Sequence, residues 1–284
     1  MLPKVDVQEA KSKKEGWYQE NYHWRFYQDD KPTLNWKQIQ GKWYYFDQDG
    51  NRLQSTVYKG YAFDQDGVMV VNSWTKLDNQ WYYADSSGRL AQNTWKKIND
   101  SWYYFDQTGS MLSNTSVDGY LLTNSGTMAE KGWIKLDQNW YYVTPSSRIS
   151  QDKWEKINGS WYAFEQNGVM LSNKWKGNYY LKASGAMAEK EWIFDKAYNR
   201  WFYLKANGTY AAREWIGAYY LKSGGYMAKN EWIYDDYYKA RYYLDDSEHY
   251  VSGTYKIDGK EHLFQKYGQW ISEVSTEGGF TKGQ

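Results

Sequence analysis

The sequence predicts an all-β protein, an elongated solenoid of stacked β-hairpins. A motif of roughly 20 residues recurs from Trp17 to Trp270 and reads Trp, six residues, Trp-Tyr-Tyr-Phe, a glycine turn and Met. Aromatic residues make up 20% of the 284 residues, with 18 Trp and 31 Tyr, yet the mean hydropathy is −0.95. The composition lacks the usual aliphatic core, so we expect aromatic side chains to do the packing that Leu, Ile and Val normally do.

One repeat, Trp95 to Met111, shows how the motif forms a hairpin. Two short aromatic-rich runs flank a polar Asn-Asp-Ser turn, and a second turn ends at Gly109, where a positive φ costs little. Side chains alternate along a strand, so Trp102 shares one face with Tyr104, while the residues between them face the other way. An isolated hairpin is marginal in water, so each repeat must stack on its neighbours.

Thirteen repeats precede a partial repeat at Trp270. They open at Trp17, Trp36, Tyr58, Trp74, Trp95, Val117 (a substitute), Trp133, Trp154, Trp175, Trp192, Trp215, Trp232 and Tyr255. From Tyr58 the steps run 16, 21, 22, 16, 21, 21, so three repeats span about 58 residues, whereas from Trp175 the steps alternate between 17 and 23. The short repeats have lost the second Trp, which is replaced by Gly60, Gly119, Asn178 and Ala218.

These periods divide the chain into four parts. We expect residues 1–15 to form a leader or linker and residues 271–284 a tail. Between them, residues 16–174 form a region with a three-repeat period and residues 175–270 a region with a two-repeat period. A bend or a change of pitch is predicted between Trp175 and Trp192.

Charge and composition exclude several functional classes. With 35 Lys and Arg against 34 Asp and Glu the net charge is +1, which gives no case for a nucleic-acid partner. There is no Cys, so disulfides and thiolate metal sites are excluded, and no apolar run is long enough to predict a membrane span. Residues 1–15 do not resemble a signal peptide, so a secreted protein would have lost its signal. The three His are scattered and adjacent Asp residues lie in turns, so neither a metal site nor a glycosidase pair is expected.

Clusters of Trp and Tyr suit two kinds of ligand. A quaternary ammonium is held by cation–π attraction in an aromatic cage, and a sugar ring stacks on an indole face. All six internal Met residues occupy one position of the repeat, two residues after the turn glycine or its substitute, and a thioether packs well beside rings. The structural alternative is that any single aromatic residue belongs to the core, but the repeated Trp pair favours a ligand role.

The pattern Gly-Trp-x-Lys, then Trp-Tyr-Tyr, then Gly-x-Met resembles the choline-binding repeat of streptococcal cell-wall proteins. It is seen at Gly132 to Lys135 and Trp140 to Tyr142, and the resemblance covers about residues 16–270. It implies a β-solenoid that binds choline or phosphocholine of teichoic and lipoteichoic acids, with two aromatic residues from one repeat and one from the next. No cofactor and no metal are implied. The implied location is secreted, on the bacterial cell wall.

The resemblance assigns the cage residues one by one. We take both Trp of a repeat and the second Tyr of the following repeat, because that Tyr shares a face with the Trp of its own strand. Four complete sites follow: Trp17, Trp24 and Tyr45; Trp74, Trp81 and Tyr104; Trp154, Trp161 and Tyr180; Trp192, Trp201 and Tyr220.

Other repeats depart from the pattern. The pairs Trp36 with Trp43 and Trp133 with Trp140 face Ala62 and Ala163, and lose the third ring unless Tyr61 and Tyr162 substitute; we still include both pairs as candidates. Trp95 and Trp102 face Leu121, which weakens that site. The repeats opening at Trp175 and Trp215 lack the second Trp, and Arg241 replaces it near the end, where a cation repels choline. Fewer than half of the repeats are therefore expected to bind in the standard way.

The expected function is a non-catalytic wall protein that binds choline and competes with wall hydrolases that use the same anchor. The repeats fill the chain and leave no room for a catalytic module. A glucan-binding module and an adhesin toward a host partner are the alternatives. A Lys two residues after the opening Trp, as in Lys76, could meet a teichoic-acid phosphate, although a solvated strand lysine is the simpler interpretation.

Overall fold

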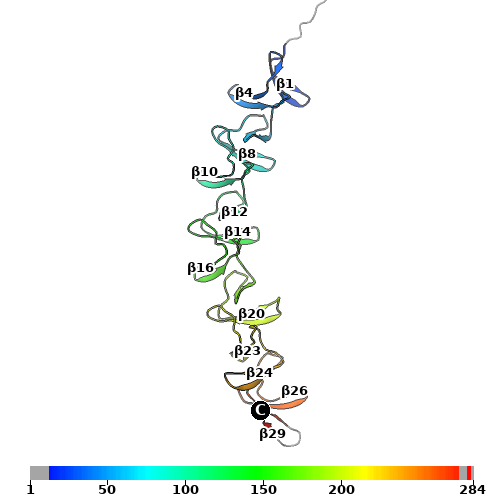
Figure 1. Ribbon diagram of the computed structural model, residues 1–284, viewed down its shortest axis with the longest axis vertical. Helices are drawn as coiled ribbons and strands as arrows, with labels where there is room; N and C mark the ends of the chain where they lie inside the picture. The colour runs from blue at the N-terminus through cyan, green and yellow to red at the C-terminus, as the bar shows by residue number, and fades with distance from the viewer. Residues whose placement is uncertain (1–12, 275–279, 283–284) are drawn as a thin grey trace, which may run out of the picture. The chain divides into compact units, whose positions relative to one another are not determined.

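The computed structural model describes residues 13–274 and 280–282, and within them every helix or strand assigned is a β-strand (Figure 1). The chain forms two compact units, one ending at Ile149 and the other beginning at Ser150. Neighbouring strands pair as antiparallel hairpins in both units, which confirms the all-β hairpin prediction.

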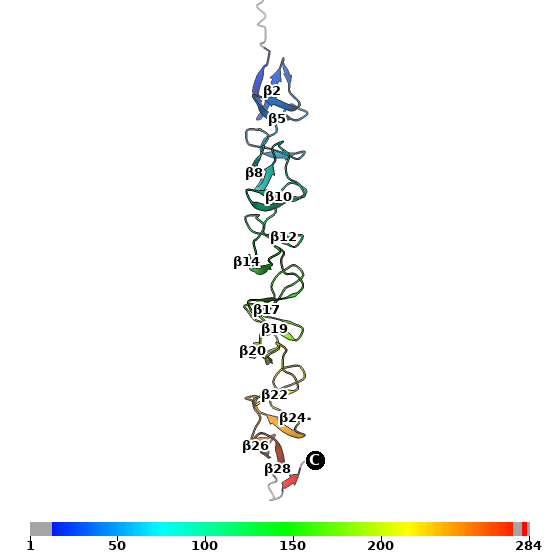
Figure 2. The same cartoon turned by 90° about the vertical axis from the view of Figure 1, so that its left-hand side faces the viewer.

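The strands of the first unit are β1 Gly16–Glu20, β2 His23–Gln28, β3 Lys31–Pro32, β4 Asn35–Ile39, β5 Lys42–Phe46, β6 Thr56–Tyr58, β7 Tyr61–Phe63, β8 Ser73–Leu77, β9 Gln80–Ala84, β10 Thr94–Ile98, β11 Ser101–Phe105, β12 Thr115–Val117, β13 Tyr120–Leu122, β14 Gly132–Leu136 and β15 Asn139–Val143. Figure 2 shows these hairpins following one another in chain order.

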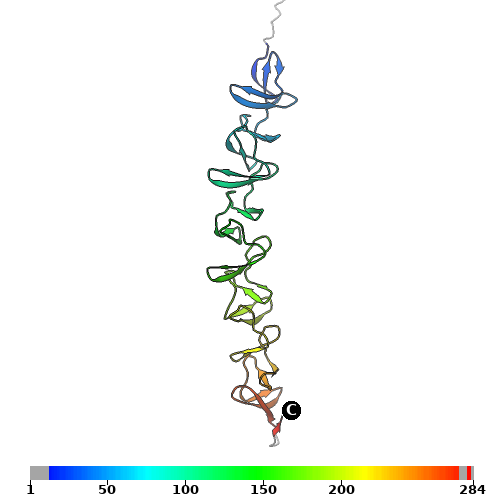
Figure 3. The same ribbon diagram turned by 60° about the vertical axis from the view of Figure 1, so that its left-hand side comes forward.

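The strands of the second unit are β16 Trp154–Ile157, β17 Ser160–Ala163, β18 Lys174–Lys176, β19 Tyr179–Leu181, β20 Glu191–Asp195, β21 Arg200–Leu204, β22 Glu214–Ile216, β23 Tyr219–Leu221, β24 Glu231–Asp235, β25 Ala240–Leu244, β26 Gly253–Ile257, β27 Lys260–Phe264, β28 Trp270–Val274 and β29 Phe280–Lys282. Strands β26 to β29 form one four-stranded sheet (Figure 3).

The hairpin β10–β11 confirms the turns predicted from its sequence. Asn99 and Asp100 have φ of +47° and +68°, the backbone of a two-residue turn that matches strand twist. After β11, the carboxylate of Asp106 accepts hydrogen bonds from the backbone N–H of Thr108 and Ser110 at 2.8 and 3.0 Å. Gly109 then takes a φ of +89°, which a residue without Cβ reaches without strain.

Consecutive hairpins are joined through the residue at the Met position. The backbone N–H of Met128 donates to the carbonyl of Trp102 in the preceding hairpin at 2.8 Å, and Met111 makes the same bond to Trp81. Met111 also forms an isolated bridge with Phe105 of its own repeat. One residue thus connects two repeats, and it holds each repeat against its predecessor.

The core consists of small clusters distributed along the repeats. Phe46, Phe63, Phe105 and Phe164 are fully buried, and so are Leu181, Leu204, Leu221 and Leu244 at the same repeat position. The prediction of an aromatic core therefore agrees with the structure only in part, because this core position holds Phe in the first group of repeats and Leu in the second. Six of the second Trp residues are exposed, with Trp102 at 41%, whereas Trp24 is half-buried. A stack of two-stranded hairpins has room inside for few large side chains at each level.

The predicted four-part division stays a prediction. Residues 1–12 lie outside the described part of the chain, and β28 and β29 lie at the end of the chain where a tail was expected. Trp175, where the period changes, lies inside the second unit.

We expect Phe105→Ala to lower the free energy of unfolding of the first unit by about 3–5 kcal/mol, because it removes a fully buried ring. Phe194→Ala is the control, since that ring is 40% exposed and its loss should cost under ~1 kcal/mol. Urea titrations followed by near-ultraviolet circular dichroism measure both. Equal losses would contradict the assignment of the core.

Candidate functional site

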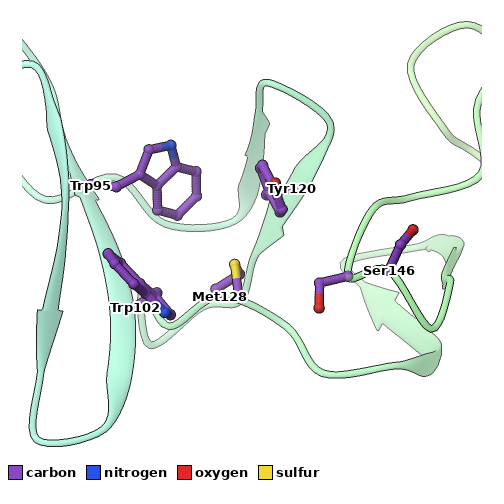
Figure 4. A pocket seen from close by; sticks show the side chains of 6 residues that line it. Trp95, Trp102, Tyr120, Met128 and Ser146 are labelled. Atoms are coloured by element: carbon purple, nitrogen blue, oxygen red, sulfur yellow. The ribbon is translucent and has the colours of Figure 1, made fainter.

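The cage at Trp95 shows the parts of one candidate site (Figure 4). Trp95 and Trp102 come from β10 and β11, Tyr120 comes from β13 of the next hairpin, and Met128 lies at the floor of the space between the three rings. The rings of Trp95 and Tyr120 are 5.5 Å apart at an interplanar angle of 72°. The cavity measures about 390 Å³ and is also bordered by Ser146 and Ser147.

Strand register places the two Trp of a pair on one face. Trp95 lies opposite Tyr104 and Lys97 lies opposite Trp102, so all four side chains point the same way. Tyr104 supports Trp95 from within the hairpin at 5.3 Å, and its hydroxyl donates to Asn93 at 3.0 Å. The Trp95 indole is therefore supported by its own hairpin.

In four of the Trp pairs the two indoles stand nearly perpendicular. In the pair Trp74 and Trp81 the ring centroids are 6.3 Å apart at 88°, and in the pair Trp133 and Trp140 they are 6.4 Å apart at 85°. Two faces at a right angle form the corner of a box, and each face presents negative quadrupole potential to a cation inside it.

The same arrangement recurs along the chain, with one ring and the Met supplied by the following hairpin. The sets are Trp36, Trp43, Tyr61 and Met69; Trp74, Trp81, Tyr103 and Met111; Trp95, Trp102, Tyr120 and Met128; Trp154, Trp161, Tyr179 and Met187; and Trp192, Tyr219 and Met227 with Trp201 at the second Trp position. The cavities at Trp74 and Trp154 measure about 260 and 300 Å³.

The third ring comes from a different Tyr than the sequence analysis chose. Trp17, Trp74, Trp154 and Trp192 face the first Tyr-position residues Tyr44, Tyr103, Tyr179 and Tyr219 at 5.1, 4.9, 5.4 and 5.3 Å. The predicted residues, Tyr45, Tyr104, Tyr180 and Tyr220, instead lie against the opening Trp of their own hairpins, Trp36, Trp95, Trp175 and Trp215.

Strand alternation explains this correction. A hairpin points its Trp pair and its second Tyr toward the cage that it opens, so the face that it offers to the preceding cage carries the first Tyr. The sequence prediction places the third ring on the same face as the Trp of its own strand. Two consecutive cages use opposite faces of the hairpin between them.

With the first Tyr as the third ring, two Trp pairs that lacked a ring at the second Tyr position gain one. Tyr61 lies 4.8 Å from Trp36, and Tyr120 takes the place that Leu121 was expected to occupy. Ala62 and Leu121 are buried in the core, at 0% and 1% exposure. The sequence signal for these two cages is that the first Tyr position keeps a ring in both repeats, where the second position has Ala62 or Leu121.

The first Trp pair differs because Arg52 stands at the Met position. The centroids of Trp17 and Trp24 are 6.3 Å apart at 84°, as in the other pairs. The backbone N–H of Arg52 donates to the carbonyl of Trp24 at 2.7 Å, which is the bond that Met makes elsewhere. Its guanidinium carbon lies 5.5 Å from the Trp17 ring and 5.9 Å from the Trp24 ring. A cation of the chain itself therefore lies against both indoles.

Burial confirms that Arg52 is packed into this cage. Its Nε is buried and has no hydrogen-bond partner among the residues that the structure describes. Burial is the main cause that lowers the pKa of the guanidinium below its ordinary value. An arginine side chain nevertheless stays charged in proteins. The predicted site of Trp17, Trp24 and Tyr45 therefore differs from the structure in two ways. Tyr44 supplies the third ring, and the Arg52 guanidinium lies against the two indoles.

Trp232, on β24, opens an altered site. Arg241 stands where a second Trp is expected, His262 replaces the Tyr at 5.4 Å from Trp232, and Trp270 occupies the Met position. The Arg241 guanidinium lies 6.0 Å from the Trp270 ring. This matches the expectation that Arg241 places a cation in that site. In the described part of the chain no group of His, Cys, Asp and Glu could hold a metal ion.

Sequence comparison identifies the repeats. A family described as choline-binding repeat matches residues 71–116, a second with the same description matches 169–210 and 209–247, and a putative cell wall binding repeat matches 35–51, 131–146 and 152–170. Together these segments cover more than half of the chain. The chain belongs to the choline-binding repeat family. No curated protein matches it, and none of the described residues forms a helix that is long and apolar enough to cross a membrane.

Several solved structures are similar to this chain. The modular autolysin LytC from Streptococcus pneumoniae is 25% identical with a TM-score of 0.48, and the match covers 84% of this chain and 52% of LytC. The choline-binding domain of CbpL from the same organism is 31% identical with a TM-score of 0.27, covering 78% of this chain and 98% of the domain. Choline binding protein F is 24% identical with a TM-score of 0.43, covering 94% and 96%. The chain spans about half the length of LytC.

The corrected third ring predicts the effect of substituting Tyr103. Tyr103→Ala should weaken choline binding at the Trp74 cage roughly 2- to 30-fold, since one ring contributes ~0.5–2 kcal/mol to holding a cation. Tyr103→Phe keeps the ring face and should bind as the wild type does. The indole N–H signal of Trp81, assigned with Trp81→Phe, reports the affinity in a titration with choline. Unchanged affinity in Tyr103→Ala would contradict the corrected geometry.

Removing the guanidinium should open the first cage. We expect the indole N–H signals of Trp17 and Trp24 to stay unchanged when choline is added to the wild type. In Arg52→Met, which places at this position the Met found at the other cages, both signals should change with choline. Arg89→Met is the control, because Arg89 lies 4.6 Å from Tyr61 and away from this pair. A wild-type Trp24 signal that responds as strongly as Trp81 would show that Arg52 does not close the cage.

Proposed function

We propose that this protein is a non-catalytic, cell-wall-attached module that binds phosphocholine of teichoic and lipoteichoic acids through the cages between its repeats. The observation that supports this most directly is the recurrent box of two perpendicular indoles, a tyrosine ring and a Met side chain. Such a box offers aromatic faces and a polarizable wall to a trimethylammonium group, which has no N–H to donate. Membership of the choline-binding repeat family supports the same ligand.

The aromatic walls set the strength of one site. Three rings at ~0.5–2 kcal/mol each give a few kcal/mol, so a free head group binds near the millimolar range. A wall polymer that carries many phosphocholine groups engages several cages of one chain at once. Binding to the polymer then exceeds single-site affinity by roughly 10²–10⁴. Weak separate cages and firm attachment to the wall are therefore compatible.

The exposed lysines support a polyanionic partner. Lys76, Lys135 and Lys156 lie 5.8, 6.0 and 5.9 Å from the rings of Trp81, Trp140 and Trp161, on the strand facing each second Trp. An ammonium beside the cage can meet the phosphate of a phosphocholine whose head group is inside. The phosphate contact is part of this proposal.

A protein that occupies choline on the wall would compete with hydrolases that use the same anchor. This modulatory role requires only that both proteins bind the same choline groups, and it requires no direct contact with a hydrolase. Of the two other candidates, a glucan-binding module differs in its ligand and is tested by titration with dextran, whereas an adhesin toward a host partner is compatible with choline binding.

Choline should change the intrinsic Trp fluorescence in a saturable way near millimolar concentration, while dextran should not. The exposed second Trp residues report directly on occupied cages. Sodium chloride at the same concentration controls for ionic strength. A response to dextran without one to choline would reject choline binding and favour the glucan-binding module.

An excess of this protein should slow the hydrolysis of choline-bearing walls by a choline-dependent hydrolase, because both occupy the same groups. The control uses walls whose choline is replaced by ethanolamine, together with a hydrolase that needs no choline. Equal rates with and without the protein on choline-bearing walls would reject the modulatory role and leave choline binding intact.

A further inference from the structure

The cavity that Trp232 opens keeps the place of a cage but not its composition. It measures about 500 Å³, whereas the cavities at the Trp-pair cages measure about 260 to 390 Å³. The second Trp, the third ring and the Met are replaced by Arg241, His262 and Trp270, and Tyr234 also lines the space. A cavity altered at three of its four cage positions is suited to a ligand other than choline.

Two indoles still form a corner in this cavity. The ring centroids of Trp232 and Trp270 are 5.9 Å apart at an interplanar angle of 80°. Trp232 stacks on the buried ring of Phe264 at 5.7 Å and 24°. The indole N–H of Trp270 donates a hydrogen bond to Nδ1 of His262 at 3.3 Å. Both indoles are therefore supported from behind, and they offer two apolar faces to a ligand.

His262 forms a wall of the cavity without adding a charge to it. The residue is buried, at 8% exposure, and its ring lies 5.4 Å from Trp232 at 74°. Because an indole N–H can only donate, the Nδ1 that accepts from Trp270 carries no hydrogen, and the imidazole that makes this bond is neutral. The charge of the cavity is therefore set by other side chains.

Arg241 gives the cavity a positive charge that has no partner in the protein. It lies opposite Tyr234 in the hairpin β24–β25, so its side chain shares a face with Trp232. No ion pair joins its guanidinium to a carboxylate within residues 13–274 and 280–282. The one carboxylate in the lining, that of Glu273, lies 3.0 Å from the Lys260 ammonium. The guanidinium is therefore the charge that a ligand meets.

Arg241 borders its cavity, whereas the arginine of the first cage fills the corner between two indoles. Arg52 lies 5.5 and 5.9 Å from the two rings of its pair, and its Nε is buried. Arg241 is exposed and lies 6.0 Å from the Trp270 ring, beside an open space of about 500 Å³. Its N–H donors are therefore accessible to a ligand that enters the corner.

We infer that this cavity is an anion site, which binds an organic carboxylate attached to a flat apolar body. The guanidinium fork of Arg241 donates to both carboxylate oxygens, and the faces of Trp232 and Trp270 receive the apolar body. One unpaired positive charge with Glu273 nearby favours a single negative charge over the two of a phosphate monoester. The ligand is opposite in charge to the ligand of the Trp-pair cages, so the inference goes beyond the proposed function and does not depend on it.

The test compares benzoate with benzamide, which has the same ring and nearly the same shape but no charge. Each is titrated into the whole chain at constant pH and ionic strength while the indole N–H signals of Trp270 and Trp81 are followed, assigned with Trp270→Phe and Trp81→Phe. We expect benzoate to move the Trp270 signal at concentrations roughly 10- to 100-fold lower than benzamide does, the range for a hydrogen bond to a charged group. Trp81, whose cage has no guanidinium in its lining, should show no preference for benzoate.

Three variants assign the effect to the charges of the cavity. Arg241→Gln should abolish the preference for benzoate at Trp270. Arg200→Gln is the matched control, because it removes the same charge from an exposed position of β21 that does not line this cavity. Glu273→Gln should tighten benzoate binding roughly 2- to 5-fold, since it removes an opposing charge that is partly exposed. None of the three replaces a buried residue, and the choline titration of Trp81 checks that each variant is folded.

The outcomes separate this inference from the proposed function. A preference for benzoate that Arg241→Gln loses and Arg200→Gln keeps supports the anion site. Equal responses of Trp270 to benzoate and benzamide, or a response to choline as strong as that of Trp81, overturn it. A tighter response to phenyl phosphate than to benzoate overturns the assignment to carboxylates. Choline binding by the Trp-pair cages is judged by Trp81 with choline, and a silent Trp81 would reject it without changing the result at Trp270.

Discussion

The fold and its candidate sites depend on one recurrent backbone hydrogen bond, from the residue at the Met position to the residue at the second Trp position of the preceding hairpin. Met111 with Trp81 and Met128 with Trp102 are examples. The bond stacks one repeat on the next, since a lone hairpin is marginal in water. It also brings the side chain at the Met position into the corner formed by two indoles. Stability and ligand geometry therefore arise from the same contact.

That coupling explains why the side chain at the Met position decides the character of each cage. A thioether leaves the box open, as at Met128, whereas Arg52 places a guanidinium against both rings of the first pair. Tyr250 at the equivalent position, whose backbone N–H donates to the carbonyl of Ala218 at 3.2 Å, lines a cavity beside Trp215 with three other tyrosines. The backbone bond is kept in all three cases, so the chemistry of the site varies without disturbing the stack.

A hairpin in such an array serves two sites at once. Its Trp pair and second Tyr face the cage that it opens, while its first Tyr closes the preceding cage, as Tyr104 and Tyr103 do on β11. The buried Phe105 shares the face of Tyr103, so the core and the third ring are supplied together. The second Trp remains exposed and accessible to a ligand, which is unusual for the largest apolar side chain.

The sequence alone determined the all-β hairpin class, the repeat positions, the turn at Gly109 and the Trp pairs, because these follow from local periodicity and turn chemistry. It did not determine the third ring. The choice between Tyr103 and Tyr104 depends on which face of a hairpin meets its neighbour, and a local pattern is compatible with both faces. The closure of the first cage by Arg52 and the cavity around Trp215 were decided by tertiary structure only, because their side chains converge from separate repeats and turns.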